Sequence, residues 1–398
     1  MTPAQDAKIN LTNIGLMVVA MILAFLLPFE TFLFAYAFLG PLHYLTEISW
    51  LHDRQYFSKG KYDYVLLLAI GILITYDYFA SKWGFHKNFT EYYSEFNLYG
   101  KLLTLGLLSS LLFILIKQPW IKILTLFFLF AFINKWFTPN AVAPNGVAYL
   151  KETKLTFALT SLLPTLIHVY AFTGLFMLYG ALKSRSKTGL WSVGVFLICP
   201  LVLIYILPFS NGLGITDFGK TAYYASGDGF WDLNLNLINK FKLTELPLLK
   251  DKATGETMYY INGDPAIDAK ACLPIIFYSK AGILLMRFIA FAYLYHYLNW
   301  FSKTEVIKWH LVPRKRLIGI IALWLLACGL YLYDYATGLM YLFFLSFTHV
   351  LLEFPLNMMS IIGIAKETRE IFKKGFQDRK STRLNSSHTD ISRMPSSA

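Results

Sequence analysis

Four histidines lie within long apolar segments of this sequence, namely His43, His168, His296 and His349. An ionisable side chain inside a bilayer is costly, so each of these histidines requires a partner or a function. Imidazole nitrogens suit iron, copper and zinc, while carboxylates and water fill the open positions of such sites. We therefore expect these histidines to hold one shared transition-metal ion.

Two of the histidines are followed four residues later by a glutamate: Glu47 follows His43, and Glu353 follows His349. Residues at this spacing share one face of a helix. A carboxylate beside a metal-bound imidazole can orient the ring without binding the metal, either from the same helix or from across the bundle. We expect Glu47 and Glu353 to support the ligands in this way.

Pro41, Pro164 and Pro355 each lie within six residues of one of these histidines. Proline interrupts the backbone hydrogen bonds of a membrane helix, and neighbouring helices must satisfy the freed groups. The sequence therefore predicts bent helices around the site.

A simpler interpretation is that each histidine is a buried hydrogen-bonding residue between helices. The depth of the histidines in the membrane bears on whether they can share one site. On ideal helices, His43 and His296 lie about 8–10 Å from the inner ends of their segments, whereas His168 and His349 lie about 22–24 Å from them. Helix tilt must supply the difference for a shared site. His43 and His296 could instead pair with His52 or His310 near the inner surface.

The composition is that of a membrane protein. Of the 398 residues, 56% are hydrophobic and 15% are charged, and the formal net charge is +12. Soluble domains carry about 25% charged residues, so a soluble enzyme is excluded. Excess lysine and arginine in a membrane protein usually lies in cytoplasmic loops, so we expect no nucleic-acid partner. The three cysteines lie far apart and indicate neither a disulfide framework nor a thiolate metal site.

The sequence predicts an all-α, polytopic transmembrane helical bundle of about ten spans, because a helix needs about 20 apolar residues to cross the hydrocarbon core. Loops rich in lysine and arginine fall on one side if both termini are inside, so we predict an N-in, C-in topology. The predicted spans are 13–28, 30–50, 63–80, 102–117, 120–137, 157–182, 190–208, 273–301, 317–335 and 338–364.

A long outer loop interrupts this pattern and predicts a small cap with a hairpin at Thr257–Ile261, followed by the turn residues Asn262 and Gly263. Within span 8, Lys280 and Arg287 are expected to reach the surface or to pair with Glu353 or Asp77. The predicted divisions are 1–208 for the first seven helices, 209–271 for the outer loop, 272–366 for the last three helices, 367–378 for a cytoplasmic tail and 379–398 for a non-native or disordered tail.

Three segments resemble the Brp/Blh family of integral-membrane, iron-dependent β-carotene dioxygenases, which cleave their substrate centrally to retinal. The early segment GPLHYLTEI resembles a GxPHGxxD-like motif, FAYLYHYLNWF resembles a WHxxRH-like element, and FTHVLLE resembles a PHxxLxE-like helix. His43, His296 and His349 match the histidines of these motifs in order, Glu47 stands where the family has an aspartate, and His168 aligns loosely with a middle histidine. Trp300 replaces the second histidine of the middle element, and the loop 209–271 is an addition.

The resemblance implies a non-haem Fe²⁺ dioxygenase acting on a lipophilic, carotenoid-like substrate that reaches it through the membrane lipids. The helical spans predict a bacterial inner membrane, because outer membranes use barrels. A retinal product would suggest a rhodopsin as downstream partner. Two alternatives remain open: a proton- or ion-coupled transporter whose path is formed by Glu47, Glu353, Asp77 and the histidines, and a non-catalytic membrane component. A bis-histidine haem protein is a further reading of the same residues.

Overall fold

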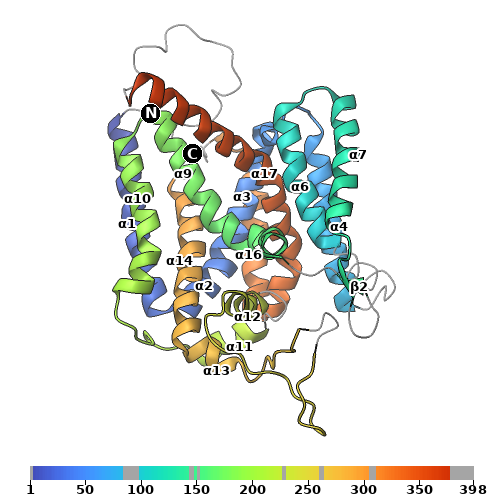
Figure 1. Ribbon diagram of the computed structural model, residues 1–398. Helices are drawn as coiled ribbons and strands as arrows, with labels where there is room; N and C mark the ends of the chain where they lie inside the picture. Colours follow the sequence, from blue (N-terminus) through green and yellow to red (C-terminus); the bar gives the residue numbers. More distant parts are fainter. Residues whose placement is uncertain are drawn as a thin grey trace.

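Long apolar helices make up most of the computed structural model, which describes residues 3–83, 98–142, 148–149, 153–225, 230–259, 264–303 and 311–376 (Figure 1). Within these ranges, nine helices are long and apolar enough to cross a membrane. The fold is therefore the predicted all-α, polytopic bundle. These helices are α1 (Pro3–Leu26), α4 (Asp63–Trp83), α6 (Leu98–Leu115), α7 (Pro119–Trp136), the run of α8 (Lys154–Phe157), η3 (Ala158–Phe172) and α9 (Thr173–Ser184), the run of α10 (Lys187–Leu201) and η4 (Val202–Ile206), α14 (Lys280–Ser302), α16 (Arg314–Tyr333) and α17 (Tyr335–Lys374).

The predicted span 30–50 is also helical, although it is divided into three pieces. A π-helical turn, η1 (Ala35–Leu39), separates α2 (Pro28–Phe34) from α3 (Gly40–Asp53). Such wide turns recur at functional sites because they re-aim the side chains around them. In the described part of the chain, the sheet structure is a two-stranded antiparallel pair of β1 (Ala141–Val142) and β2 (Ala148–Tyr149).

Figure 1 shows that α1 begins and α17 ends at the same end of the bundle, as an even number of crossings requires. The segment between η4 and α14 lies at the opposite end. It contains α11 (Asp217–Ala225), α12 (Phe230–Lys240) and α13 (Leu273–Tyr278). Which end faces the cytoplasm stays a prediction, and the tail from 377 onward lies outside the described residues.

The predicted outer loop 209–271 contributes side chains to the bundle core. Tyr223 of α11 packs edge-on against Phe29, with ring centroids 5.1 Å apart, and Phe230 of α12 packs against Phe32 at 4.5 Å. Beyond α12 the chain forms an arm held by isolated antiparallel bridges, one of which joins Tyr259 to Pro265. Residues 260–263, which include the end of the predicted hairpin and its turn residues Asn262 and Gly263, lie outside the described residues.

Two helical runs exceed the thickness of a bilayer. The 40 residues of α17 correspond to about 60 Å, against about 30 Å for the hydrocarbon core. The run through η3 has 31 residues. Pro355 lies inside α17 and Pro164 inside η3, so both runs bend near the middle. The last part of α17 consequently lies obliquely across the end of the bundle (Figure 1).

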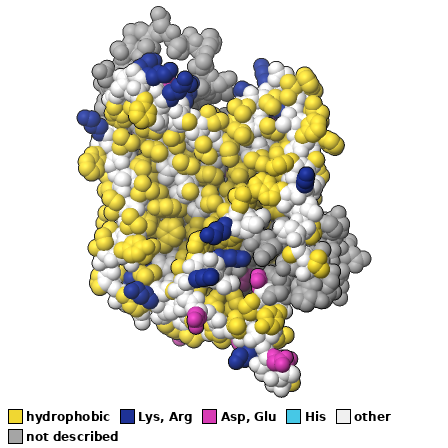
Figure 2. Space-filling model, in the orientation of Figure 1, with side chains coloured by type: hydrophobic (Ala, Val, Ile, Leu, Met, Phe, Trp, Pro, Cys, Tyr) yellow, Lys and Arg dark blue, Asp and Glu magenta, His cyan; other side chains and the backbone are white. Residues whose placement is uncertain are grey.

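The surface agrees with a membrane location. Figure 2 shows hydrophobic side chains covering most of the face that it draws. Large apolar side chains such as Phe127, Trp191 and Leu332 are exposed on three different helices. Soluble proteins rarely expose contiguous apolar areas of this extent. The chain is thus a multi-pass membrane protein.

The two cations of predicted span 8 differ in their surroundings. Lys280 is exposed at the start of α14, as predicted. Arg287 is fully buried; it donates a hydrogen bond to the Ser210 carbonyl at 2.8 Å and lies 4.0 Å from the centroid of the Phe25 ring. Arg287 therefore pairs with neither of the carboxylates proposed from the sequence, because the folded loop after η4 supplies its partner.

Gly282 marks a tight junction between α13 and α14. A β-carbon at this position would collide with the carbonyl oxygens of Ile275 and Ile276. We expect Gly282→Ala to destabilise the protein by about 1–3 kcal/mol, the usual cost of overpacking. The measurement is the midpoint of denaturant-induced unfolding in detergent. Gly319→Ala is the matched control, because a β-carbon there meets open space; equal midpoints for the two variants would contradict the prediction.

Candidate metal centre

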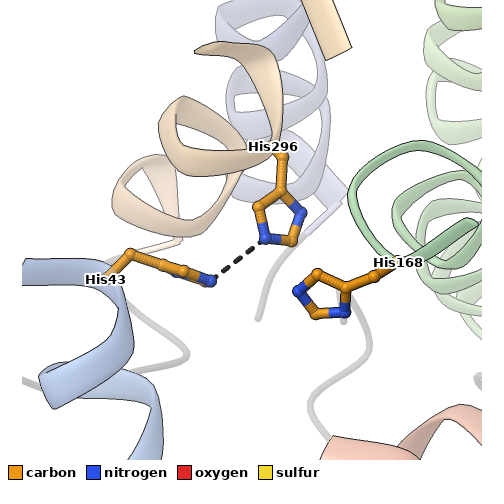
Figure 3. A group of neighbouring side chains, drawn as sticks. All are labelled: His43, His168 and His296. Atoms are coloured by element: carbon orange, nitrogen blue, oxygen red, sulfur yellow. Dashed lines mark hydrogen bonds between the residues drawn. The ribbon is translucent and has the colours of Figure 1, made fainter. Parts of the chain in front are cut away.

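The four predicted histidines converge at one point inside the bundle. His43 comes from α3, His168 from η3, His296 from α14 and His349 from α17, and each side chain is at least 94% buried. The Nε2 atoms of His43 and His296 lie 3.1 Å apart, as do those of His168 and His349. Figure 3 shows His43, His168 and His296 pointing toward one another from three separate helices. The structure thus brings the four predicted histidines together.

Helix length and tilt remove the apparent difference in depth between the histidines. His168 and His349 lie on the two runs that are longer than the bilayer is thick, and both runs must lean or bend. Their rings consequently reach the level of His43 and His296, with the centroids of His168 and His296 5.0 Å apart. The alternative partner His52 lies outside this cluster with an exposed side chain, and His310 lies outside the described residues.

Two polar contacts hold imidazoles with Nε2 directed inward. The Thr173 hydroxyl donates to the Val169 carbonyl at 2.9 Å, so it accepts from Nδ1 of His296 at 2.7 Å. Across the bundle, Nδ1 of His168 lies 3.0 Å from a Glu353 carboxylate oxygen, an ion-pair contact without the geometry of a hydrogen bond. A proton on Nδ1 leaves the lone pair of Nε2 free, which is the form that binds a metal.

The two glutamates contact different nitrogen atoms of the histidine cluster. Glu353 contacts His168 on another helix rather than His349 on its own, which is the cross-bundle form of the predicted support. Glu47 reaches the inward nitrogen instead, because its carboxylate oxygen lies 3.0 Å from Nε2 of His43. Ligand atoms of His43, Glu47 and His349 lie within 4.8 Å of one another. Glu47 is thus placed as a candidate ligand as well as a supporting residue.

The donor set fits a divalent metal ion. Two imidazoles at about 2.1 Å from one ion lie about 3.0 Å apart when at right angles and about 3.4 Å apart in a tetrahedron. The observed Nε2 separations of 3.1 Å match this range. Two buried carboxylates beside neutral imidazoles would carry uncompensated negative charge, which a dication offsets. Nitrogen and oxygen donors without a thiolate suit iron, zinc, copper or manganese.

Aromatic side chains enclose the histidines. Tyr44 stacks on His349 with ring centroids 4.1 Å apart, and its hydroxyl lies 2.9 Å from that of Tyr297. Trp300 packs edge-on against His43 with ring centroids 5.4 Å apart and donates to the Thr46 hydroxyl at 2.9 Å. Trp300 therefore closes one side of the site and adds no ligand.

A cavity of about 520 Å³ opens beside the centre. His168 and His349 form part of its wall, together with apolar side chains such as Ile74, Phe347 and Val350. Its volume lies within the range of small-molecule sites in proteins. The arrangement thus places a candidate metal centre against a mostly apolar chamber.

Sequence reasoning found the histidines and glutamates but missed the residues that hold them. Thr173 carries no motif, since a threonine five residues after a histidine is common in apolar helices. Tyr44 and Trp300 adjoin predicted residues, but aromatic side chains in membrane helices are mostly packing or interface residues. Comparison of the chain with protein-family models, with curated proteins and with solved structures found no match.

Proposed function

We propose that the protein is a membrane-embedded, iron-dependent oxygenase that acts on a long apolar, carotenoid-like substrate. The single observation that carries this proposal is the position of the buried histidine cluster: two of its members, His168 and His349, line the apolar cavity of about 520 Å³. A purely structural histidine cluster would not need such a chamber beside it.

Each residue of the candidate metal centre has its own proposed role. His43, His168, His296 and His349 would hold iron, with Glu47 balancing its charge. Iron, when bound, supplies the binding and activation of O₂. Glu353 and Thr173 keep two of the rings in the metal-binding form. Tyr44 and Trp300 exclude water from the centre, which protects reactive species from side reactions.

The cavity would hold and orient the substrate. Its apolar walls suit a polyene chain, and the bilayer would deliver such a molecule laterally without passage through water. Central cleavage of a carotene would yield retinal, and a rhodopsin would be the partner that consumes it. By the same reasoning, we propose the inner membrane of a bacterium as its location, because outer membranes use barrels.

The proposal is tested with protein purified in detergent, loaded anaerobically with Fe²⁺ and then exposed to β-carotene and air. We expect consumption of O₂ and formation of retinal, detected by chromatography, and loss of both in His349→Ala. His52→Ala is the control, because that side chain is exposed away from the cluster. Iron-loaded protein that consumes no O₂ with β-carotene or its hydroxylated forms would contradict the proposal, and proton transport in liposomes would then be measured.

A further inference from the structure

The cavity beside the metal centre has a polar region at a distance from the histidines. Asp77 from α4 and both Asp232 and Asn236 from α12 belong to its wall. None of these residues contributes to the metal centre. Polar side chains in the wall of a chamber fix the orientation of a ligand and select its functional groups.

The position of Asp77 follows from the packing of α4 against α17. Tyr78, the next residue, stacks on Phe343 with ring centroids 4.3 Å apart. Phe343 precedes His349 by six residues in α17, which corresponds to about 9 Å along the helix. Between these two levels the wall includes Phe347 and Ser346. A bound molecule would therefore meet iron at one level and a carboxylate at another.

The Asp77 carboxylate is prepared to accept a hydrogen bond. Its Oδ1 atom is buried and has no hydrogen-bond partner among the described residues. A buried acceptor without a donor is destabilising, so a ligand that supplies a donor is favoured. A carboxylate repels another carboxylate, so the group it accepts from is a donor such as a hydroxyl rather than an acid.

Residues of α12 mark the mouth of the cavity. Asp232 and Asn236 are four residues apart, share one face of the helix, and are exposed. Phe230 of the same helix also lines the cavity, and its contact with Phe32 anchors α12 in the core. A polar end group would thus lie near the outer surface, with the apolar chain extending inward to the histidines.

We propose that this cavity selects substrates whose long apolar chain ends in a hydroxyl group, with Asp77 accepting the hydrogen bond from that hydroxyl. The inference rests on the proposed oxygenase function and specifies its substrate class. A hydroxylated carotenoid has the required features, since it combines a polyene chain with a hydroxyl on its end ring.

The experiment compares β-carotene with zeaxanthin, its dihydroxylated form. Dissociation constants are measured by tryptophan fluorescence quenching on metal-free protein in detergent, and kcat/KM is measured on iron-loaded protein. We expect zeaxanthin to bind at least about tenfold more tightly, the usual effect of a hydrogen bond to a charged group. Asp77→Leu should abolish this preference by weakening the binding of zeaxanthin, and Asp77→Asn should reduce it.

Asp217→Leu is the matched control, because it removes an exposed carboxylate from the same end of the molecule; it should keep the preference. Equal dissociation constants in the wild type, or a preference that survives in Asp77→Leu, would overturn the inference. If zeaxanthin is preferred through Asp77 but neither carotenoid is cleaved, the hydroxyl site stands and the oxygenase proposal fails. Cleavage of both with equal kcat/KM would support the oxygenase and overturn the hydroxyl site.

Discussion

Replacing His43 with alanine is expected to remove iron from the protein. His43 belongs to both groups of candidate ligands, the one with His168 and His296 and the one with Glu47 and His349. Its loss would therefore weaken every arrangement of the centre. Substitutions of residues that merely support a metal ligand cost about 10–100-fold in affinity, so loss of this ligand should cost more than about 100-fold.

The measurement is iron content after anaerobic loading and desalting, with the unfolding midpoint as a check on folding. His52 lies nine residues later in the same helix and has an exposed side chain, so the His52→Ala variant should bind iron like the wild type. A His43→Ala protein that keeps a full complement of iron would show that the cluster is a hydrogen-bonded core rather than a metal centre.

The second large effect is expected at Glu353. Its carboxylate lies 3.0 Å from Nδ1 of His168 on a different helix, and we expect it to orient that ring. In Glu353→Leu nothing holds that ring in the metal-binding form, and iron affinity should fall about 10–100-fold. Glu353→Gln keeps an oxygen that can accept from Nδ1, so its effect should be smaller. Iron affinity is measured by competition with a chelator of known affinity.

Glu367→Leu provides the comparison for this series. Glu367 lies on the same helix but pairs with Arg185 at 2.9 Å, away from the histidines. Its loss should lower stability while leaving the iron affinity of the folded protein unchanged. If Glu353→Leu and Glu367→Leu bind iron equally well, Glu353 has no role in orienting the ligand.

The transmembrane architecture was predictable because hydropathy is a strong signal over 20 residues. Each predicted span falls on helical structure, although 30–50 is divided by the π-helical turn of η1 and 273–301 is divided at Ser279 between α13 and α14. The histidines were predictable for a related reason, since an imidazole within an apolar run stands out against its neighbours. Spacing also placed Glu47 and Glu353 near the site.

The remaining features depend on packing, which sequence patterns do not encode. Tilt is set by contacts between helices, so the common depth of His43 and His349 could not be read from segment boundaries. Glu353 contacts His168 on another helix rather than His349 on its own, and i,i+4 spacing cannot show which of the two it contacts. The segment 209–271 was expected to form a cap outside the bundle. Phe230 of this segment is instead buried in the core, because burying apolar side chains of a short helix is also favourable.

Asp77 illustrates the same limit. From sequence it was a possible partner for Arg287 or part of a proton path. The structure places it in the wall of the cavity, while Arg287 binds Ser210. Its role as a selector of hydroxylated substrates follows from this position rather than from any motif.

The central claim is that these histidines form a non-haem iron centre. The most direct test is the iron content of the purified wild-type protein after anaerobic loading, read together with its visible spectrum. The account predicts close to stoichiometric iron and no Soret band. Protein that remains free of iron after such loading, or that shows a Soret band from bound haem, would contradict it.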